Sequence, residues 1–215
     1  MHGSNHGGRR SRSSERDESS SGLFEIELMS TQKGNQRAVF LDRDGTVSKE
    51  IGYMYDVSLY QVFPWTGEAI RKINETGMRV ILATNQSGVE RGYFTERMVN
   101  RVHRRLQEEI GRSGARLDDA YFCPHRPESG CPCRKPRPGM LYKGQQELAI
   151  DLDNSYMVGD RYLDVRTGRA AGTRTILVMT GDGSQERDRY QDEEIQPDLF
   201  AENLAEAAEL IRKGR

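Results

Sequence analysis

Short apolar runs alternate with longer amphipathic stretches along the chain from Arg37 onward. A run of about four apolar residues that ends in polar residues is typical of a strand buried in a sheet. Such runs cover residues 38–41, 80–83, 120–122, 156–158 and 175–178. The pattern therefore predicts five strands.

The stretches between these runs carry apolar residues at helical spacing. The clearest begins with Thr95 as N-cap and ends at Gly111, with apolar residues at positions 99, 102, 106 and 110 on one side. Further helices are predicted over 68–75, 139–148, 164–171 and 202–212. Strands that alternate with helices predict an α/β fold, a Rossmann-like three-layer sandwich with a central parallel sheet. Ligands bind such a sheet at the carboxyl ends of its strands.

The N-terminal segment has a different composition. Its first 22 residues hold no apolar side chain except Met1 and are rich in Ser, Gly, Arg and Glu. Such a segment cannot bury enough apolar surface to offset the entropy lost on ordering. Residues 1–36 are therefore predicted to be a disordered tail, and residues 37–215 one domain. An alternative interpretation of the basic run 9–14 is a small arm that binds nucleic acid, although acidic residues follow it at once. A translation start at Met29 is a further alternative.

Charge and composition narrow the classes of function. The 32 Lys and Arg residues nearly balance 33 Asp and Glu residues, for a net charge of −1, so no overall basic field attracts nucleic acid or an anionic membrane. No apolar run approaches the roughly 18 residues of a membrane span, and the polar N-terminus lacks the apolar core of a secretory signal. These features predict a soluble, cytoplasmic protein.

Two carboxylates follow the first predicted strand, in Asp42-Arg43-Asp44-Gly45-Thr46. An unpaired buried charge is costly, so two acids at a strand end indicate a bound cation or a reaction. The alternative is an acidic turn in which Gly45 supplies a positive φ.

Three later motifs favour the reaction. Thr84-Asn85-Gln86-Ser87-Gly88 follows the second strand and offers a hydroxyl and backbone amides to phosphate oxygens. Lys135 lies in a loop that enters a helix, and Asp160 and Asp164 follow another strand. Each motif is weak alone, but their order after successive strands predicts one shared site.

Cysteine spacing predicts a second, separate site. Cys123, His125, Cys131 and Cys133 form a Cys3His set in which no cysteine is left over. Four protein ligands match tetrahedral Zn²⁺ in a structural role. The alternative is three buried free thiols and a surface histidine.

The strand-end motifs together resemble the phosphatases of the haloacid dehalogenase superfamily, from about Arg37 to Asp182. The resemblance implies a Mg²⁺ ion held by the carboxylates of Asp42 and Asp160 and by the backbone carbonyl of Asp44. It implies that Asp42 is the nucleophile and forms an aspartyl phosphate, and that Asp44 is the general acid and base.

The remaining residues of the motifs receive supporting roles from the same resemblance. Lys135 and Thr84 would hold the equatorial phosphate oxygens. Asp164 would orient other groups without touching the metal.

The zinc loop directly before Arg134-Lys135 resembles the heptose 1,7-bisphosphate phosphatases and the related histidinol-phosphate phosphatases. In that group the residue at Arg134 helps to recognise substrate. Its substrate site is lined by the positions that correspond to Glu50, Ile51, Gly52 and Tyr53 and to Thr84, Asn85, Gln86 and Ser87. Only five residues separate His125 from Cys131, fewer than in the longer-looped heptose enzymes, which leaves the substrate open.

Spacing limits the architecture around the site. Between Asp42 and Thr84 there is room for a flap, one helix and one strand, but not for a cap domain, so the site is expected to be open. Tyr53 and Tyr93 are candidates to pack against a sugar or imidazole ring. His103, among Arg101, Arg104 and Arg105, is expected on the solvated face of its helix.

The leading prediction is a Mg²⁺-dependent phosphatase that removes the 7-phosphate of a heptose 1,7-bisphosphate on the route to activated heptose for surface polysaccharide. Alternatives within the class are histidinol phosphate or a broad range of small phosphate esters. A noncatalytic protein that binds through its zinc loop is a different class, against which Asp42, Asp44, Lys135 and Asp160 all argue. Nucleic-acid end processing is disfavoured by the balanced charge. A monomer is expected, without a nucleic-acid or membrane partner.

Overall fold

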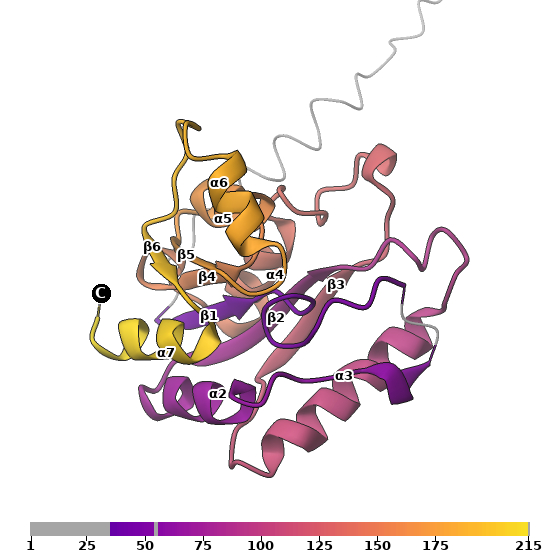
Figure 1. Ribbon diagram of the computed structural model, residues 1–215, viewed down its shortest axis with the longest axis horizontal. Helices are drawn as coiled ribbons and strands as arrows, with labels where there is room; N and C mark the ends of the chain where they lie inside the picture. Colours follow the sequence, from indigo (N-terminus) through magenta and orange to yellow (C-terminus); the bar gives the residue numbers. More distant parts are fainter. Residues whose placement is uncertain (1–34, 54–55, 215) are drawn as a thin grey trace, which may run out of the picture. The chain divides into compact units, whose positions relative to one another are not determined.

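A six-stranded parallel sheet forms the centre of the described fold, with strands in the order β3-β2-β1-β4-β5-β6 (Figure 1). The computed structural model describes residues 35–53 and 56–214, which belong to one compact unit. The strands are β1 (Ala38–Leu41), β2 (Arg79–Asn85), β3 (Asp119–Cys123), β4 (Tyr156–Gly159), β5 (Arg174–Val178) and β6 (Leu199–Ala201). Every neighbouring pair is parallel, which confirms the predicted sheet.

Helices cover both faces of this sheet, as the three-layer prediction requires. Figure 1 shows α2, α3 and α7 on one face and α4 and α5 on the other. The helices are α2 (Thr66–Glu75), α3 (Glu96–Gly111), α4 (Gly139–Leu148), α5 (Tyr162–Ala171), α6 (Gly183–Arg189) and α7 (Leu204–Arg212). Short 3₁₀ turns cover Val57–Leu59, Pro127–Ser129 and Leu152–Asn154.

The two cores follow from the alternation of side chains along the strands. In β1, Val39 and Leu41 pack into one core with Ile70 of α2. Phe40 points the other way and packs with Leu141 of α4. Because both faces are covered, the central strands read as unbroken apolar runs, which is the signal that the sequence carries.

The order of the strands reverses beside β1. The strand pairs with β2 on one side and with β4 on the other, so the loops that leave β1 and β4 diverge. In a doubly wound sheet this divergence opens a crevice at the carboxyl ends of the strands, where ligands bind.

Two elements escaped the sequence pattern. Strand β6 has three residues and an exposed Phe200, and helix α6 has only one buried residue, Gly183. Neither buries an apolar stripe long enough to produce a periodic signal.

The predicted disordered tail lies outside the described residues up to position 34. Within the described part, the backbone N–H of Gln36 donates to the Ala149 carbonyl at 3.1 Å, and the Gln36 carbonyl accepts from Asp151 at 2.7 Å. The chain is therefore tied to the fold from Gln36 onward. Among the helices of the described ranges, none has the length and apolar character needed to cross a membrane.

Candidate active site

An open cleft of about 390 Å³ lies at the carboxyl ends of the central strands. Its lining residues come from loops far apart in sequence. They are Asp42, Asp44, Glu50, Gly52, Tyr53, Thr84, Asn85, Gln86, Ser87, Gly88, Phe94, Arg134, Lys135, Arg161 and Leu163. The fold thus brings together the motifs that the sequence placed after β1, after β2 and before α4.

Lys135 occupies the floor of this cleft between two carboxylates. Its Nζ lies 2.8 Å from Asp42 Oδ1 and 2.6 Å from Asp164 Oδ1, and its side chain is 1% exposed. Burial alone would lower the pKa of Lys135, but the charges of Asp164 and Asp42 outweigh it and raise the pKa. Lys135 is therefore a fixed cation next to the carboxylate of Asp42.

Asp160 lies beneath the cleft in a cradle made of backbone. A Cβ on Gly45 or on Gly181 would come within 2.1 Å of Asp160 Oδ2, so side chains are excluded there. The backbone N–H of Asp182 donates to the same oxygen at 2.9 Å. Burial, followed by the charges of Asp42 and Asp164, raises the pKa of Asp160 to about 8.

Three carboxylates meet at this point. Asp42, Asp160 and Asp164 each offer an oxygen, and these oxygens lie within 4.8 Å of one another. Burial and the charge of Asp42 raise the pKa of Asp164 to about 6, against the opposing effect of Lys135. One lysine does not balance three buried acids, so the cluster favours a cation.

Asp44 is held by two side chains of its own neighbourhood. Arg43 donates from Nε to Oδ1 at 3.0 Å and from Nη2 to Oδ2 at 2.7 Å, and Gln86 Nε2 donates to Oδ2 at 3.0 Å. Gln86 also donates to Thr84 Oγ1 at 2.9 Å. No role for Arg43 could be predicted from the sequence, since an arginine beside an acid in a turn is ordinarily exposed, whereas this one is 1% exposed.

The loop after β2 also fixes the lysine loop. Asn85 Oδ1 accepts from the Lys135 backbone N–H at 3.1 Å, and Asn85 Nδ2 donates to the Lys135 carbonyl at 3.2 Å. Asn85 is thus placed to position Lys135. Thr84 and Ser87 line the cleft beside it.

The flap after β1 supplies one wall. Glu50, Gly52 and Tyr53 line the cleft, but Ile51 does not, because its side chain packs against the apolar core. Glu50 Oε1 accepts from the Gly52 N–H at 2.7 Å. Burial and the charge of Asp44 raise the pKa of Glu50.

The two candidate ring-stacking tyrosines contact each other. Tyr53 and Tyr93 lie edge to face with centroids 4.5 Å apart, and Tyr53 lines the cleft while Tyr93 is not among its lining residues. Tyr53 is therefore the candidate ring at the cleft, and Tyr93 packs against it.

Arg161 is a further lining residue that the sequence did not single out. Its Nη2 lies 2.7 Å from Asp182 Oδ2 and 3.8 Å from Glu50 Oε2. It adds a second half-exposed guanidinium to the cleft, in addition to Arg134. A surface arginine after an aspartate carries no distinctive signal in a sequence.

The predicted Cys3His set is assembled beside the cleft. Cys123 Sγ lies 3.5 Å from both His125 Nδ1 and Cys131 Sγ, while Cys133 Sγ lies 3.3 Å from His125 Nδ1 and 3.4 Å from Cys131 Sγ. Tetrahedral zinc with ordinary bond lengths would separate such ligand atoms by about 3.5–3.8 Å. The four ligand atoms lie slightly closer together than this and suit a metal ion such as zinc, and all three cysteines are free.

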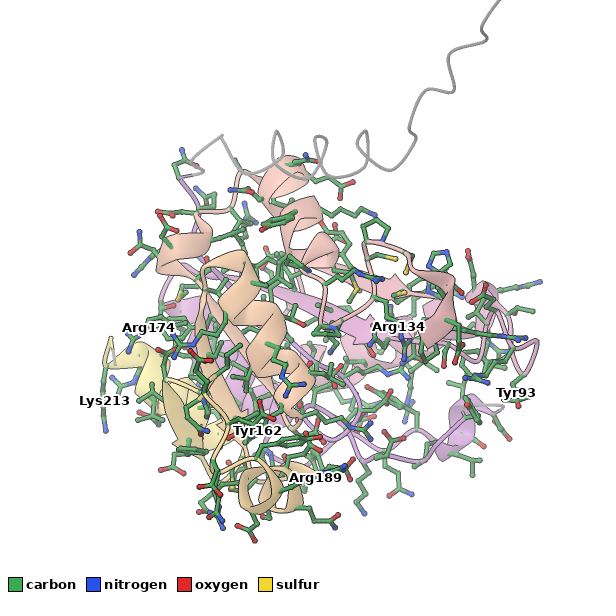
Figure 2. The ribbon with its side chains drawn as sticks, turned by 90° about the horizontal axis from the view of Figure 1, so that it is seen from above. Tyr93, Arg134, Tyr162, Arg174, Arg189 and Lys213 are labelled. Atoms are coloured by element: carbon green, nitrogen blue, oxygen red, sulfur yellow. The ribbon has the colours of Figure 1, made fainter. Side chains whose placement is uncertain are left out.

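The thiols of Cys123 and Cys133 share one hydrogen bond. This bond lowers the pKa of Cys123 to about 5 and, with burial, raises the pKa of Cys133, so the protein groups alone favour one thiolate, the form that zinc binds. Arg134 connects this cluster to the cleft, because its Nη1 donates to the His125 carbonyl at 3.0 Å. Figure 2 shows Arg134 next to the group of sulfur atoms.

Comparison with known proteins agrees with this geometry. The HAD-hydrolase-like family profile matches residues 132–207. A D-glycero-D-manno-heptose-1,7-bisphosphate 7-phosphatase of Thermosynechococcus vestitus is 42% identical over 185 residues, 81% of this chain and 94% of that protein. A D-glycero-beta-D-manno-heptose-1,7-bisphosphate 7-phosphatase of Yersinia pestis is 42% identical over 67% of this chain and 81% of its own.

Solved structures point to the same group. The D,D-heptose 1,7-bisphosphate phosphatase of B. bronchiseptica, complexed with magnesium and phosphate, superposes with a TM-score of 0.77 at 31% identity and covers 84% of this chain and 100% of its own. The chain therefore belongs to the HAD-like hydrolase family, in the group of phosphatases that includes these heptose-bisphosphate enzymes.

Proposed function

We propose that this phosphatase removes the 7-phosphate of D-glycero-D-manno-heptose 1,7-bisphosphate through an aspartyl-phosphate intermediate on Asp42. The proposal rests on one observation, the ion pair at the floor of the cleft. There Asp42 Oδ1 lies 2.8 Å from the ammonium nitrogen of Lys135. The choice of substrate is supported by the relatives that are 42% identical to this chain, which are named as phosphatases of this bisphosphate.

The carboxylate cluster is suited to a hard divalent cation. Three acids with one lysine leave excess negative charge, and the pKa of Asp160 is raised by its burial and then by the charges of Asp42 and Asp164. Oxygen ligands are those that Mg²⁺ prefers. We assign Asp42, Asp160 and the Asp44 carbonyl as its ligands, and Asp164 as the residue that positions Lys135. When bound, Mg²⁺ would offset the charge of the phosphate and of Asp42 as they approach each other.

In the first step, a carboxylate oxygen of Asp42 attacks phosphorus and forms a new P–O bond. The bond between phosphorus and the sugar oxygen breaks. Asp44, protonated beforehand, gives its proton to that oxygen, which leaves as an alcohol. Lys135 and Thr84 hold the other phosphate oxygens while charge moves through the transition state.

In the second step, a water molecule attacks the phosphorus of the aspartyl phosphate. Asp44 accepts a proton from the water, and the P–O bond to Asp42 breaks. Inorganic phosphate leaves, Asp42 is regenerated as a carboxylate and Asp44 is again protonated. Asp42 must be a carboxylate when it attacks, whereas Asp44 must be protonated when the sugar oxygen leaves. This difference explains why the cleft contains two carboxyl groups.

Two guanidinium groups support a substrate with a second phosphate. Arg134 and Arg161 both line the cleft together with Lys135. Arginine binds phosphate oxygens in a bidentate manner. A bisphosphate can therefore place one phosphate at Asp42 and the other within reach of an arginine.

We assign zinc to Cys123, His125, Cys131 and Cys133 in a structural role. Four protein ligands leave no open position for catalysis. The bond from Arg134 to the His125 carbonyl connects zinc binding to the wall of the cleft.

The proposal includes a cytoplasmic setting and a monomer that needs no nucleic-acid or membrane partner. The net charge of −1 supports the absence of a polyanion partner.

Substrate preference tests the proposal. Phosphate release with Mg²⁺ is measured from both anomers of the heptose bisphosphate, from histidinol phosphate and from fructose 1,6-bisphosphate. We expect kcat/KM for one heptose anomer to exceed the others by about a hundredfold, roughly 2.7 kcal/mol of transition-state discrimination. Equal low rates on all of them would reject the heptose assignment and keep the phosphatase.

A further inference from the structure

Arg43 is a buried charge to which the two-step reaction assigns no task. Its side chain is 1% exposed, and its Nη1 has no hydrogen-bond partner among the described residues. A buried ion pair contributes little to stability compared with apolar packing. The position of Arg43 therefore indicates a purpose other than holding the fold together.

Arg43 is restrained both at its backbone and at its guanidinium group. The Arg43 carbonyl accepts from the backbone N–H groups of Val47 at 3.0 Å and Ser48 at 3.1 Å, which fixes the turn. The Tyr60 ring lies 5.9 Å from the Arg43 Cζ. Arg43 is therefore a rigid partner for whatever it contacts.

The guanidinium group of Arg43 donates hydrogen bonds to both carboxylate oxygens of Asp44. The planar fork of Nε and Nη2 bonds Oδ1 and Oδ2 at 3.0 and 2.7 Å. A bidentate grip fixes the plane of a carboxyl group, which a single ammonium group does not do.

The two oxygens of Asp44 are not equivalent. A carboxylate oxygen has two lone-pair directions. Oδ2 accepts from Arg43 Nη2 and from Gln86 Nε2, whereas Oδ1 accepts only from Arg43 Nε. Oδ1 therefore keeps a free lone pair, and Asp44 lines the cleft.

We propose that Arg43, assisted by Gln86, is a positioning residue that orients Asp44 so that Oδ1 carries the transferable proton. The inference rests on the proposed function, because it concerns the general acid of that reaction. Arg43 itself is buried and is not among the residues that line the cleft.

The test compares esters whose leaving groups differ in basicity. A sugar alkoxide needs a proton as it leaves, whereas p-nitrophenolate leaves readily without one. We expect Arg43→Met to lower kcat/KM about 10²-fold for the sugar phosphate and less than about fivefold for p-nitrophenyl phosphate. Arg43→Lys keeps the charge without the fork, and we expect it to show a smaller loss with the same dependence on the leaving group.

A double-mutant cycle with Asp44→Asn separates positioning from structure. If Arg43 acts through Asp44, adding Arg43→Met to Asp44→Asn changes kcat/KM by less than about twofold. Arg174→Met is the matched control, since Arg174 also stacks on a tyrosine ring, at 5.3 Å from Tyr156, but belongs to β5 outside the cleft.

The outcomes are distinct. Equal losses on both esters, or a full additional loss in the Asp44→Asn background, would overturn the positioning role. If Arg43→Met does not fold, the leaving-group dependence of Arg43→Lys decides by the same criterion. Wild-type protein that hydrolyses neither ester would instead refute the proposed function.

Discussion

The Lys135 ammonium group lies 2.6 Å from a carboxylate oxygen of Asp164, and both side chains are 1% exposed. Asp164 is also the third residue of α5, where its other oxygen accepts from the Arg161 backbone N–H at 3.2 Å. One carboxylate thus caps a helix and holds the lysine that faces Asp42. The position of the Lys135 ammonium group therefore depends on the first turn of α5.

Replacement of this lysine tests that arrangement. Lys135→Met leaves Asp42 and Asp164 buried without their counter-charge, so we expect kcat/KM to fall by at least about 10²–10³-fold and stability to fall by roughly 3–5 kcal/mol. Steady-state kinetics and urea unfolding measure the two effects. Lys143→Met, at a lysine with a 55% exposed side chain on α4, should change neither. Full activity of Lys135→Met would contradict the role of the lysine.

Asp160 predicts a pH dependence of magnesium binding. Its pKa is raised from 3.8 to about 8 in the folded protein, so between these pH values the folded state holds more protons than the unfolded chain. The contribution of Asp160 to stability is therefore largest below pH 3.8 and is lost as the pH rises through about 8. Because Mg²⁺ replaces the proton, its affinity should increase as the pH approaches 8.

Thermal unfolding with and without Mg²⁺ measures this effect. We expect the Mg²⁺-induced rise in Tm to be larger near about pH 9 than near about pH 6. Asp160→Asn should raise the Tm of the metal-free protein near about pH 9, where it removes one of three crowded charges, and should abolish the response to Mg²⁺. A response that is independent of pH would contradict the assignment of Asp160.

If the Cys3His cluster holds zinc as we propose, activity should fall when the metal is removed. Cys131→Ser removes one of four ligands, so the chain should no longer retain about one zinc ion after dialysis. Since Arg134 is bonded to the His125 carbonyl, we expect KM to rise more than kcat falls. Metal analysis and steady-state kinetics on the same sample measure the zinc content, KM and kcat of this variant. A zinc-free variant with unchanged KM and kcat would show that the loop does not support the cleft.

Two glycines with similar backbone angles provide a matched pair for the Asp160 cradle. Gly45 has φ +84° and Gly77 has φ +79°, but a Cβ on Gly45 would lie 2.1 Å from Asp160 Oδ2 whereas one on Gly77 meets nothing within 4 Å. Gly77→Ala should cost about 1 kcal/mol from backbone strain alone. Gly45→Ala should cost more and should also weaken Mg²⁺ binding. Similar effects of both variants on Mg²⁺ affinity would contradict the cradle.

The sequence predicted the central strands and the Cys3His cluster because their signals are local. Strand β1 matches its apolar run residue for residue, and the Cys3His spacing predicted a cluster that the fold closes. Polar residues at the ends of β1 and β4 marked the site, since parallel strands place their carboxyl ends together.

Expectations that failed depend on packing between distant elements, as for Ile51, which packs against the core, and for His103. His103 was expected in solvent among arginines, but its side chain is 7% exposed and its ring packs edge to face on Phe122 of β3 at 6.1 Å. Burial, together with the charge of Arg43, lowers its pKa to about 3. Its place four residues after Val99, on the apolar stripe of α3, was the available signal. No comparable signal marked Arg43, because its role depends on where its side chain turns.

The most direct test of the account is the fate of the two phosphates of D-glycero-D-manno-heptose 1,7-bisphosphate, followed by phosphorus NMR with Mg²⁺. The wild-type protein should release the 7-phosphate as inorganic phosphate and leave the 1-phosphate in place. Asp42→Asn should release none while it keeps its fold and its zinc. Release by Asp42→Asn at the wild-type rate, or loss of the 1-phosphate in place of the 7-phosphate, would contradict the account.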